Sequence, residues 1–157
     1  MIKPVYAMSQ VGDCPRALSA MRLGIEPTPQ SHGDLSRLAH YSRCESLAAQ
    51  QIRDLGFELQ EGGLCQKCGR QGIHVEIDTP LFLLVGHLDR RMKLDSMTLP
   101  VEIKSLGKSS WMRFQKTGFA SFPGYAAQEA CYLKAESSPG IYWVMERDSG
   151  SSLKYCI

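Results

Sequence analysis

The chain has 157 residues, a length that fits one domain. Its 43% hydrophobic and 22% charged residues are typical of an ordinary soluble globular protein, and they exclude the disordered, collagen-like and coiled-coil classes. The net charge of +2 is too small to argue for or against nucleic acid as a partner, so that question depends on local clusters of charge.

Helices are predicted mainly in the first third of the chain. A helix over residues 14–23 is favoured because Asp13 is a good N-cap, Pro15 suits the first turn and Gly24 can end it. A longer helix is predicted over residues 34–55, closed by Gly56.

The rest of the chain alternates between short strands and helices. Strands are predicted at residues 57–60, 73–77, 81–89, 99–105, 141–146 and 153–157, and helices at residues 109–116 and 123–135. This order favours one α/β domain over residues 1–157, with a central mixed β-sheet flanked by helices.

Two features bear on the compartment. The longest uninterrupted apolar run, residues 81–85, is far below the roughly 18 residues that a membrane span needs, so we expect no membrane partner. The N-terminus lacks the apolar core of a secretory signal. We therefore expect a cytoplasmic protein, in which the six cysteines are thiols or metal ligands rather than disulfides.

One face of the long helix carries a carboxylate among apolar residues. Positions spaced 3-4-3-4-3 share a face, and they read Leu38, Tyr41, Glu45, Ala48, Ile52 and Leu55. An unpaired buried carboxylate is costly, so Glu45 is expected to have a metal ion, a lysine or an arginine as its partner. Arg16 is the candidate if Glu45 belongs to a structural ion pair.

A second cluster of charge lies where two predicted strands end. The apolar run of residues 81–85 leads into Gly86-His87-Leu88-Asp89, and Glu102-Ile103-Lys104 follows after a turn region. Strand alternation places Glu102 and Lys104 on one face, and a hairpin-like connection would bring Asp89 beside Glu102. Oxygen ligands of this kind select Mg²⁺ or Mn²⁺ over zinc. The alternative is a surface Glu-x-Lys pair, which is common.

Four short motifs in this order resemble those of the PD-(D/E)XK nuclease superfamily. The likeness is to its RecB-like exonuclease branch, which includes CRISPR-associated and phage-encoded relatives. The motifs are Glu45, Gly86-His87-Leu88-Asp89, Glu102-Ile103-Lys104 and Gln128-Glu129-Ala130-Cys131-Tyr132, and Cys14-Pro15-Arg16 resembles the start of many such domains. The resemblance spans about residues 9–146. It implies a restriction-endonuclease-like core and a metal-dependent DNA exonuclease of phage or prokaryotic recombination, repair or defence.

The resemblance also implies a role for each charged residue. Asp89 and Glu102 would bind the divalent metal together with the carbonyl of Ile103, and Glu45 would be a further ligand, directly or through water. Lys104 would orient or deprotonate the attacking water. This agrees with the needs of phosphodiester hydrolysis, since a bound metal lowers the pKa of its water and an ammonium group offsets the developing negative charge.

Other residues are implied around this centre. Gln128 and Tyr132, one helical turn apart, would brace the site and touch the DNA backbone. His87 and His40 are weaker candidates for the metal or its surroundings. His40 lies well round the helix from Glu45.

The segment between Lys104 and Tyr125 mixes basic and aromatic residues, a combination that commonly holds single-stranded nucleic acid. The alternative is that its aromatic residues belong to the core. The predicted DNA contacts are Arg16, Lys108, Trp111, Arg113 and Lys116.

Cys65 and Cys68 have the spacing of half a zinc knuckle, in a small insertion at about residues 61–72. A structural zinc needs four ligands, and His74, Cys44 or a second subunit could complete the set. The alternative is a plain hairpin with free thiols.

Several RecB-like relatives hold a [4Fe–4S] cluster with one N-terminal and three C-terminal cysteines. Cys14 matches the first position, but only Cys131 and Cys156 are available for the other three. A [4Fe–4S] cluster is therefore not predicted.

The motifs leave other functions open. An endonuclease of the same fold, such as a junction resolvase or a restriction-like enzyme, would carry the same residues. A nucleic-acid-binding module that does not cleave has no need of all three of Asp89, Glu102 and Lys104. A zinc-stabilised interaction protein is a further alternative, and a homo-oligomer or a partner subunit is compatible with each of these.

Overall fold

The structure is a computed structural model that describes residues 3–26 and 28–157. The N-terminal part contains strand β1 (Val5–Ala7), the 3-10 helix η1 (Met8–Gln10) and helices α1 (Pro15–Arg22) and α2 (His32–Asp54). The middle of the chain forms strands β2 (Glu58–Glu61), β3 (Ile73–Asp78), β4 (Leu83–Leu88), β5 (Arg90–Leu94) and β6 (Met97–Leu106). The C-terminal part contains α3 (Lys108–Thr117), the 3-10 helix η2 (Gly118–Ser121), α4 (Pro123–Glu136), β7 (Ile141–Glu146) and β8 (Ser152–Cys156).

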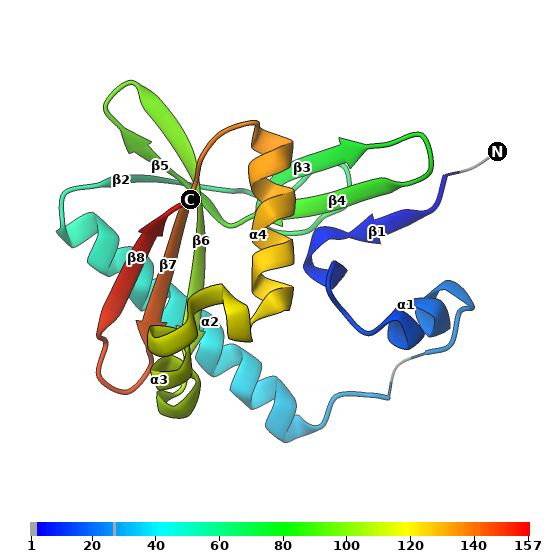
Figure 1. Cartoon of the computed structure of the whole chain (residues 1–157), viewed down its shortest axis with the longest axis horizontal. Coiled ribbons are helices and arrows are strands. Elements are labelled where there is room, and N and C mark those ends of the chain that lie inside the picture. Colours follow the sequence, from blue (N-terminus) through cyan, green and yellow to red (C-terminus); the bar gives the residue numbers. More distant parts are fainter. Residues whose placement is uncertain (1–2, 27) are drawn as a thin grey trace.

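The strands form two mixed sheets (Figure 1). The smaller has the order β1-β4-β3, in which β1 runs parallel to β4 and β3 runs antiparallel to it. The larger has the order β2-β5-β6-β7-β8, in which β6 and β7 are the parallel pair. The predicted α/β class with a mixed sheet and flanking helices is confirmed, and the strands are divided between two sheets where the sequence predicted one.

Helices cover both faces of the larger sheet. Ala48 and Ile52 of α2 pack with Val101 and Ile103 of β6 on one face. On the other face, Phe114 of α3 packs in a second apolar cluster with residues of β6 and β7. Strand β6 thus lies between two layers of helix, which explains why most of its residues are buried (Figure 1).

Helix α4 packs on the smaller sheet and lies between the two sheets in Figure 1. Tyr132 of α4 meets Val75 of β3, Leu88 of β4 and Met8 of η1 in a third cluster. This packing leaves no room for a side chain at Gly86, because a Cβ there would lie 2.6 Å from Cε1 of Tyr132. The glycine therefore allows α4 to approach the strand that leads to Asp89.

The expected apolar stripe of α2 is only partly correct. Ala48 and Ile52 are fully buried, but Leu38 and Leu55 are 48% and 60% exposed. The first turns of α2 extend beyond the strands in Figure 1, so their apolar positions have no sheet to cover them. Within the described residues, none of the helices combines the length and apolar character required to cross a lipid bilayer.

Strands β1 and β5 were not predicted. Residues 90–94, expected to be part of a turn region, form β5, which pairs with β2 and with β6. Three of its five residues are basic, so its own composition gives little indication of a strand. Helix α1 begins at Pro15, with Cys14 and not Asp13 in the cap position.

Candidate active site

Two strands bring the predicted carboxylates together where the chain passes from the smaller sheet to the larger. β4 ends one residue before Asp89, and β5 begins one residue after it. Arg90 of β5 pairs with Val101 of β6 in antiparallel register. Asp89 precedes Arg90 and Glu102 follows Val101, so these two residues lie next to each other beyond this pair. Both line one cleft of about 290 Å³. The expected proximity of these two carboxylates is therefore present, although it comes from a β5–β6 hairpin rather than from a turn.

The same cleft is lined by other predicted residues. Lys104 comes from β6, and Gln128 and Tyr132 come from α4. Arg70 and Gln71, from the loop between β2 and β3, also line it, and no sequence pattern pointed to a role for either. The cleft thus combines acidic, basic and amide groups, as a site for an anionic substrate and a cation requires.

Glu102 and Lys104 form an ion pair on one face of β6, as the strand alternation predicts. Glu102 is 3% exposed, and burial raises the pKa of its carboxyl group while the charge of Lys104 opposes that rise. Burial works against the charge of Lys104, but the nearby carboxylates, Glu102 above all, outweigh it and raise the pKa of the ammonium group. Lys104 therefore keeps its proton in this structure.

Gln128 and Tyr132 brace the wall of the cleft. The amide of Gln128 donates to the hydroxyl of Tyr132 over 3.1 Å, and this hydroxyl donates to the backbone carbonyl of His87 over 3.3 Å. Burial is the main cause that raises the pKa of Tyr132 to about 12, so its hydroxyl remains a donor. These contacts connect α4 to the segment that ends at Asp89.

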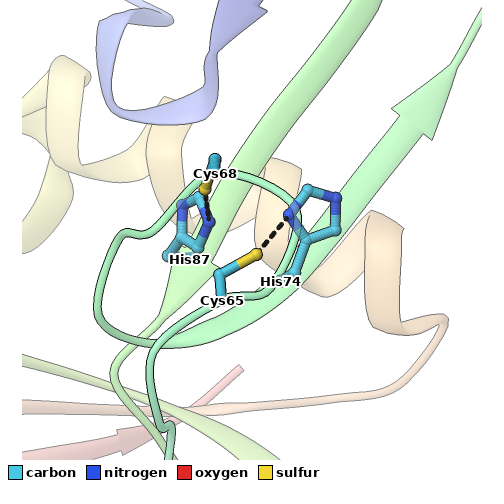
Figure 2. A group of neighbouring side chains, drawn as sticks. All are labelled: Cys65, Cys68, His74 and His87. Carbon is cyan, nitrogen blue, oxygen red and sulfur yellow. Dashed lines mark hydrogen bonds between the residues drawn. The ribbon is translucent and has the colours of Figure 1, made fainter.

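The two predicted histidines differ in their relation to the carboxylates. His87 lines the cleft, and its Nε2 atom is 3.1 Å from Sγ of Cys68. Figure 2 draws this contact as a dashed line. His40 is exposed, and its Nε2 atom lies 3.6 Å from Sγ of Cys44, one turn further along α2. His40 contacts its own helix and lines neither cleft that holds the carboxylates, whereas His87 faces a thiol and lines the cleft of Asp89 and Glu102, so a role for His87 around the Mg²⁺ site stays a prediction.

Glu45 reaches the same centre from α2. It shares a second cleft, of about 180 Å³, with Asp89 and Arg90. Burial is the main cause that raises its pKa to about 7, and the charge of Lys104 is the main opposing effect. The proposed pairing of Glu45 with Arg16 is corrected, because the cations that act on Glu45 are Lys104 and Arg90. Arg16 is exposed near the start of α1 and lines neither cleft.

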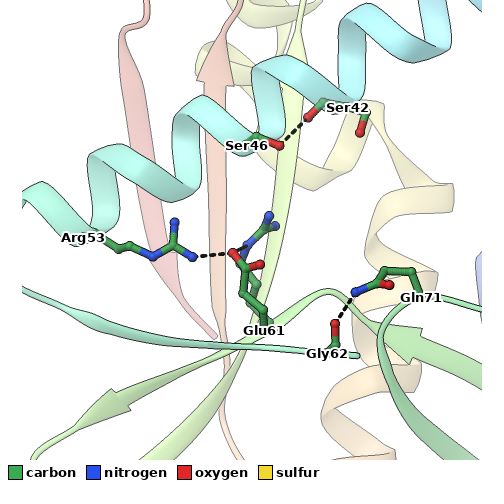
Figure 3. A network of polar contacts seen from close by, with 7 residues as sticks. Ser42, Ser46, Arg53, Glu61, Gly62 and Gln71 are labelled. Atoms are coloured by element: carbon green, nitrogen blue, oxygen red, sulfur yellow. Dashed lines mark hydrogen bonds and ion pairs between the residues drawn. The ribbon is translucent and has the colours of Figure 1, made fainter. Parts of the chain in front are cut away.

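A polar network forms the other wall of this second cleft (Figure 3). Glu61 of β2 pairs with Arg53 of α2 and accepts from Nε of Arg90 over 3.3 Å. Gln71 donates to the carbonyl of Gly62 in the same network. Glu61 thus anchors Arg90, the residue that directly follows Asp89 in the chain.

Glu129 is a buried carboxyl group for which no role was predicted. It is 2% exposed, and neither of its oxygens has a hydrogen-bond partner among the described residues. Burial first, and the charge of Glu102 second, raise its pKa to about 8, so it is protonated at neutral pH. The spacing of Tyr125, Glu129 and Tyr132 places all three on one helix face, which was the available signal.

This pKa makes the stability of the fold depend on Glu129. The unfolded carboxyl ionises above its ordinary pKa of 4.5 while the folded one keeps its proton to about 8, so stability is full below pH 4.5 and falls as the pH rises to 8. We expect Glu129→Gln to remove this part of the fall. A rise of the pKa from 4.5 to about 8 corresponds to about 5 kcal/mol at about 1.4 kcal/mol per pKa unit, and the variant should gain about 4 kcal/mol of it over wild type between pH 5 and pH 9. Urea unfolding across this range measures it, with Glu58→Gln as an exposed control. Parallel curves for Glu129→Gln and wild type would contradict the assignment.

An aromatic stack leads from Lys104 to the surface of α3. The ammonium of Lys104 lies 5.5 Å from the ring centre of Tyr125, and this ring stacks on Phe122 with 5.3 Å between centres. The guanidinium of Arg113 lies over the ring of Phe122, 4.6 Å from its centre. Arg113 therefore lies at the outer end of a path that begins in the cleft.

The other predicted DNA contacts on α3 differ in exposure. Lys108, Arg113 and Lys116 are exposed. Trp111 is 7% exposed and packs in the apolar cluster around Phe114. The expectation that Trp111 stacks on nucleic acid is therefore corrected, because its ring is a core side chain.

Several solved structures are similar to this chain, including the two that follow. The crystal structure of an alkaline exonuclease (LHK-Exo) from Laribacter hongkongensis matches with a TM-score of 0.63 and 17% identity, over 97% of this chain and 76% of that one. The crystal structure of SSO0001 matches with a TM-score of 0.55 and 15% identity, over 98% of this chain and 68% of that one. No known family model and no curated protein matches the sequence. The chain therefore has an α/β fold similar to that of an exonuclease.

Proposed function

We propose that this protein is a divalent-metal-dependent DNA nuclease of the PD-(D/E)XK type, and an exonuclease of the RecB-like branch. The observation that carries the proposal is the convergence of Asp89, Glu102 and Lys104 in one cleft, with Glu45 beside them. A module that only binds DNA has no need of this set of carboxylates around a lysine. The similarity in fold to an alkaline exonuclease supports the exonuclease over the endonuclease.

The carboxylates suit a hard divalent cation. Burial raises the pKa values of Glu45 and Glu102, and the negative charge of Asp89 raises both further. Groups that repel one another in this way are held ionised by a cation, and carboxylate oxygens are ligands of Mg²⁺ and Mn²⁺. We assign Asp89, Glu102 and the carbonyl of Ile103 as metal ligands, with Glu45 as a further one. When bound, the metal supplies Lewis acidity and lowers the pKa of its water.

Lys104 is assigned to positioning and charge rather than to proton abstraction. Its raised pKa keeps the ammonium group protonated, so it can donate to the attacking water and offset the charge that develops on the phosphate. Tyr132 and Gln128 hold the wall of the cleft, and Gln128, the more exposed of the two, is assigned a contact with the DNA backbone.

The test is degradation of end-labelled linear single- and double-stranded DNA beside a covalently closed circle, with Mg²⁺, Mn²⁺ or EDTA. We expect loss of the linear substrates only, and only with metal, with the released label giving the polarity. Cleavage of the circle would identify an endonuclease. DNA binding without cleavage in any lane would contradict the nuclease proposal.

We propose that exposed cations of α3 contact the DNA backbone where it leaves the cleft. Arg113 and Lys116 lie on its surface, and Arg113 ends the aromatic stack that begins at Lys104. We expect the double variant Arg113→Ala/Lys116→Ala to reduce the slope of log K against log salt by about 1–2, since each phosphate contact contributes about 0.9. Fluorescence anisotropy in EDTA measures the slope, with Lys134→Ala as the control. An unchanged slope would remove α3 from the DNA path.

A further inference from the structure

The loop between β2 and β3 folds into a tight turn that carries two thiols. The backbone N–H of Cys65 donates to the carbonyl of Arg70 over 2.7 Å, and that of Gly69 donates to the carbonyl of Cys65 over 2.7 Å. Gly69 has a φ of 72°, which a residue with a side chain rarely adopts. The turn therefore brings Cys65 and Cys68 to the same side of the loop.

Two imidazoles lie under this turn. His74 of β3 and His87 of β4 are direct partners in the antiparallel register, so their side chains share one face of the smaller sheet. Figure 2 shows the loop lying over these strands, with one thiol opposite each ring. Sγ of Cys65 is 3.6 Å from Nδ1 of His74, and Sγ of Cys68 is 3.1 Å from Nε2 of His87.

We propose that these four residues bind a structural zinc ion. One ligand atom from each of Cys65, Cys68, His74 and His87 lies within 4.8 Å of the others. Ligands about 2.0–2.3 Å from a tetrahedral zinc are about 3.5 Å apart, which is close to the two sulfur–nitrogen distances. Two thiolates and two imidazoles form a complete set for structural zinc, so neither Cys44 nor a second subunit is needed.

The surroundings of His74 support this assignment. Its Nε2 atom is 3.0 Å from a carboxylate oxygen of Glu76, which is also paired with Lys67 at 3.3 Å. A hydrogen bond from Nε2–H to Glu76 leaves the lone pair of Nδ1 directed at the thiol side. Histidines that bind metals characteristically donate their other N–H to a carboxylate in this way.

The zinc would fasten the loop against the strand that leads to the active site. His87 lies two residues before Asp89, and the N–H of Gly62 at the base of the loop donates to the carbonyl of Asp89 over 3.2 Å. The loop also carries Arg70, which lines the cleft with Asp89 and Lys104. The ion thus has a positioning role, and it is distinct from the Mg²⁺ or Mn²⁺ of the proposed function.

The first test is the metal content of the full chain, purified with zinc supplied and then dialysed. We expect one zinc per chain in wild type and in the control Cys14→Ser/Cys156→Ser, whose thiols are exposed and outside the cluster. Cys65→Ser/Cys68→Ser should retain less than about a tenth as much. Absence of zinc from wild type, or equal zinc in both double variants, would overturn the proposal. The measurement involves no DNA, so it does not depend on nuclease activity.

A second variant guards against a loss of zinc caused by misfolding. His74→Cys keeps four ligands, so it should retain one metal per chain and shift the Co²⁺ absorption toward that of three thiolates. An unchanged Co²⁺ spectrum would remove His74 from the site. The rate of trypsin cleavage at Lys67 and Arg70 measures whether zinc holds the loop in place. We expect rapid cleavage at these residues only after a strong chelator has removed the zinc. Cleavage at an equal rate with and without zinc would contradict the fastening role.

Discussion

Lys104→Met is expected to lower the rate of DNA cleavage by about 10²–10³-fold or more, the cost of removing one preorganised donor from a reaction that develops negative charge. Lys104 is largely buried beside Glu102, and its raised pKa keeps it charged throughout the pH range of an assay. The methionine removes the charge and keeps most of the volume. Single-turnover cleavage of linear DNA with saturating Mg²⁺ measures the chemical step.

The variant also leaves Glu102 buried without its cation. We therefore expect Lys104→Met to be less stable than wild type without metal, and to recover most of this loss when Mg²⁺ is added. Lys104→Arg keeps the charge and distinguishes the loss of charge from the loss of shape, and Lys154→Met, on the exposed side of β8, is the surface control. A folded Lys104→Met enzyme with wild-type activity would exclude a role for Lys104 in cleavage.

Local pattern was sufficient for the part of the site that depends on one strand. Glu102 and Lys104 share a face because side chains alternate along a strand with a period of two. This relation does not depend on which strands pair with β6. Glu45 was recognisable as a carboxylate on an apolar helix face, and it is half-buried next to the cleft. In each case nearby residues on the same helix or strand carried the information.

Features that depend on register could not be predicted in this way. The pairing of His74 with His87 joins two strands whose alignment is decided by the whole smaller sheet. His87 was consequently a weaker candidate for the Mg²⁺ site or its surroundings, and its contact with Cys68 was not predicted. Strand β5 could not be predicted for the same reason. Its basic residues have little intrinsic preference for a strand, and pairing with β2 and β6 holds them in one.

Trp111 and Glu129 show a third limit, in which the residue type does not indicate the environment. An aromatic residue among basic ones suggests a binding surface, yet Trp111 fills the core beneath the exposed Arg113. A glutamate in a helix is typically exposed to solvent, yet Glu129 is buried. Tertiary packing decided both environments, since each residue lies on the side of its helix that meets a sheet.

Asp89→Asn is expected to abolish the response of the protein to divalent metal without destabilising the fold. Asp89 is exposed in the cleft, whereas Glu102 is buried, so the asparagine leaves no buried charge unpaired. The negative charge of Asp89 contributes to the raised pKa values of Glu45 and Glu102. Its removal relieves this repulsion, so we expect the metal-free variant to be at least as stable as wild type.

The metal-bound states should behave in the opposite way. Wild type should gain about 2.7 kcal/mol at a metal concentration of about 100 times Kd, and Asp89→Asn should gain almost nothing there. Loss of a direct ligand should weaken metal binding by more than the 10–100-fold typical of a residue that only orients a ligand, and cleavage should be lost with it. Thermal unfolding with and without Mn²⁺ measures both states, with the exposed Asp78→Asn as the control. If Asp89→Asn is stabilised by Mn²⁺ as wild type is, the metal does not bind at the carboxylates of this cleft, and the nuclease proposal loses its chemical basis.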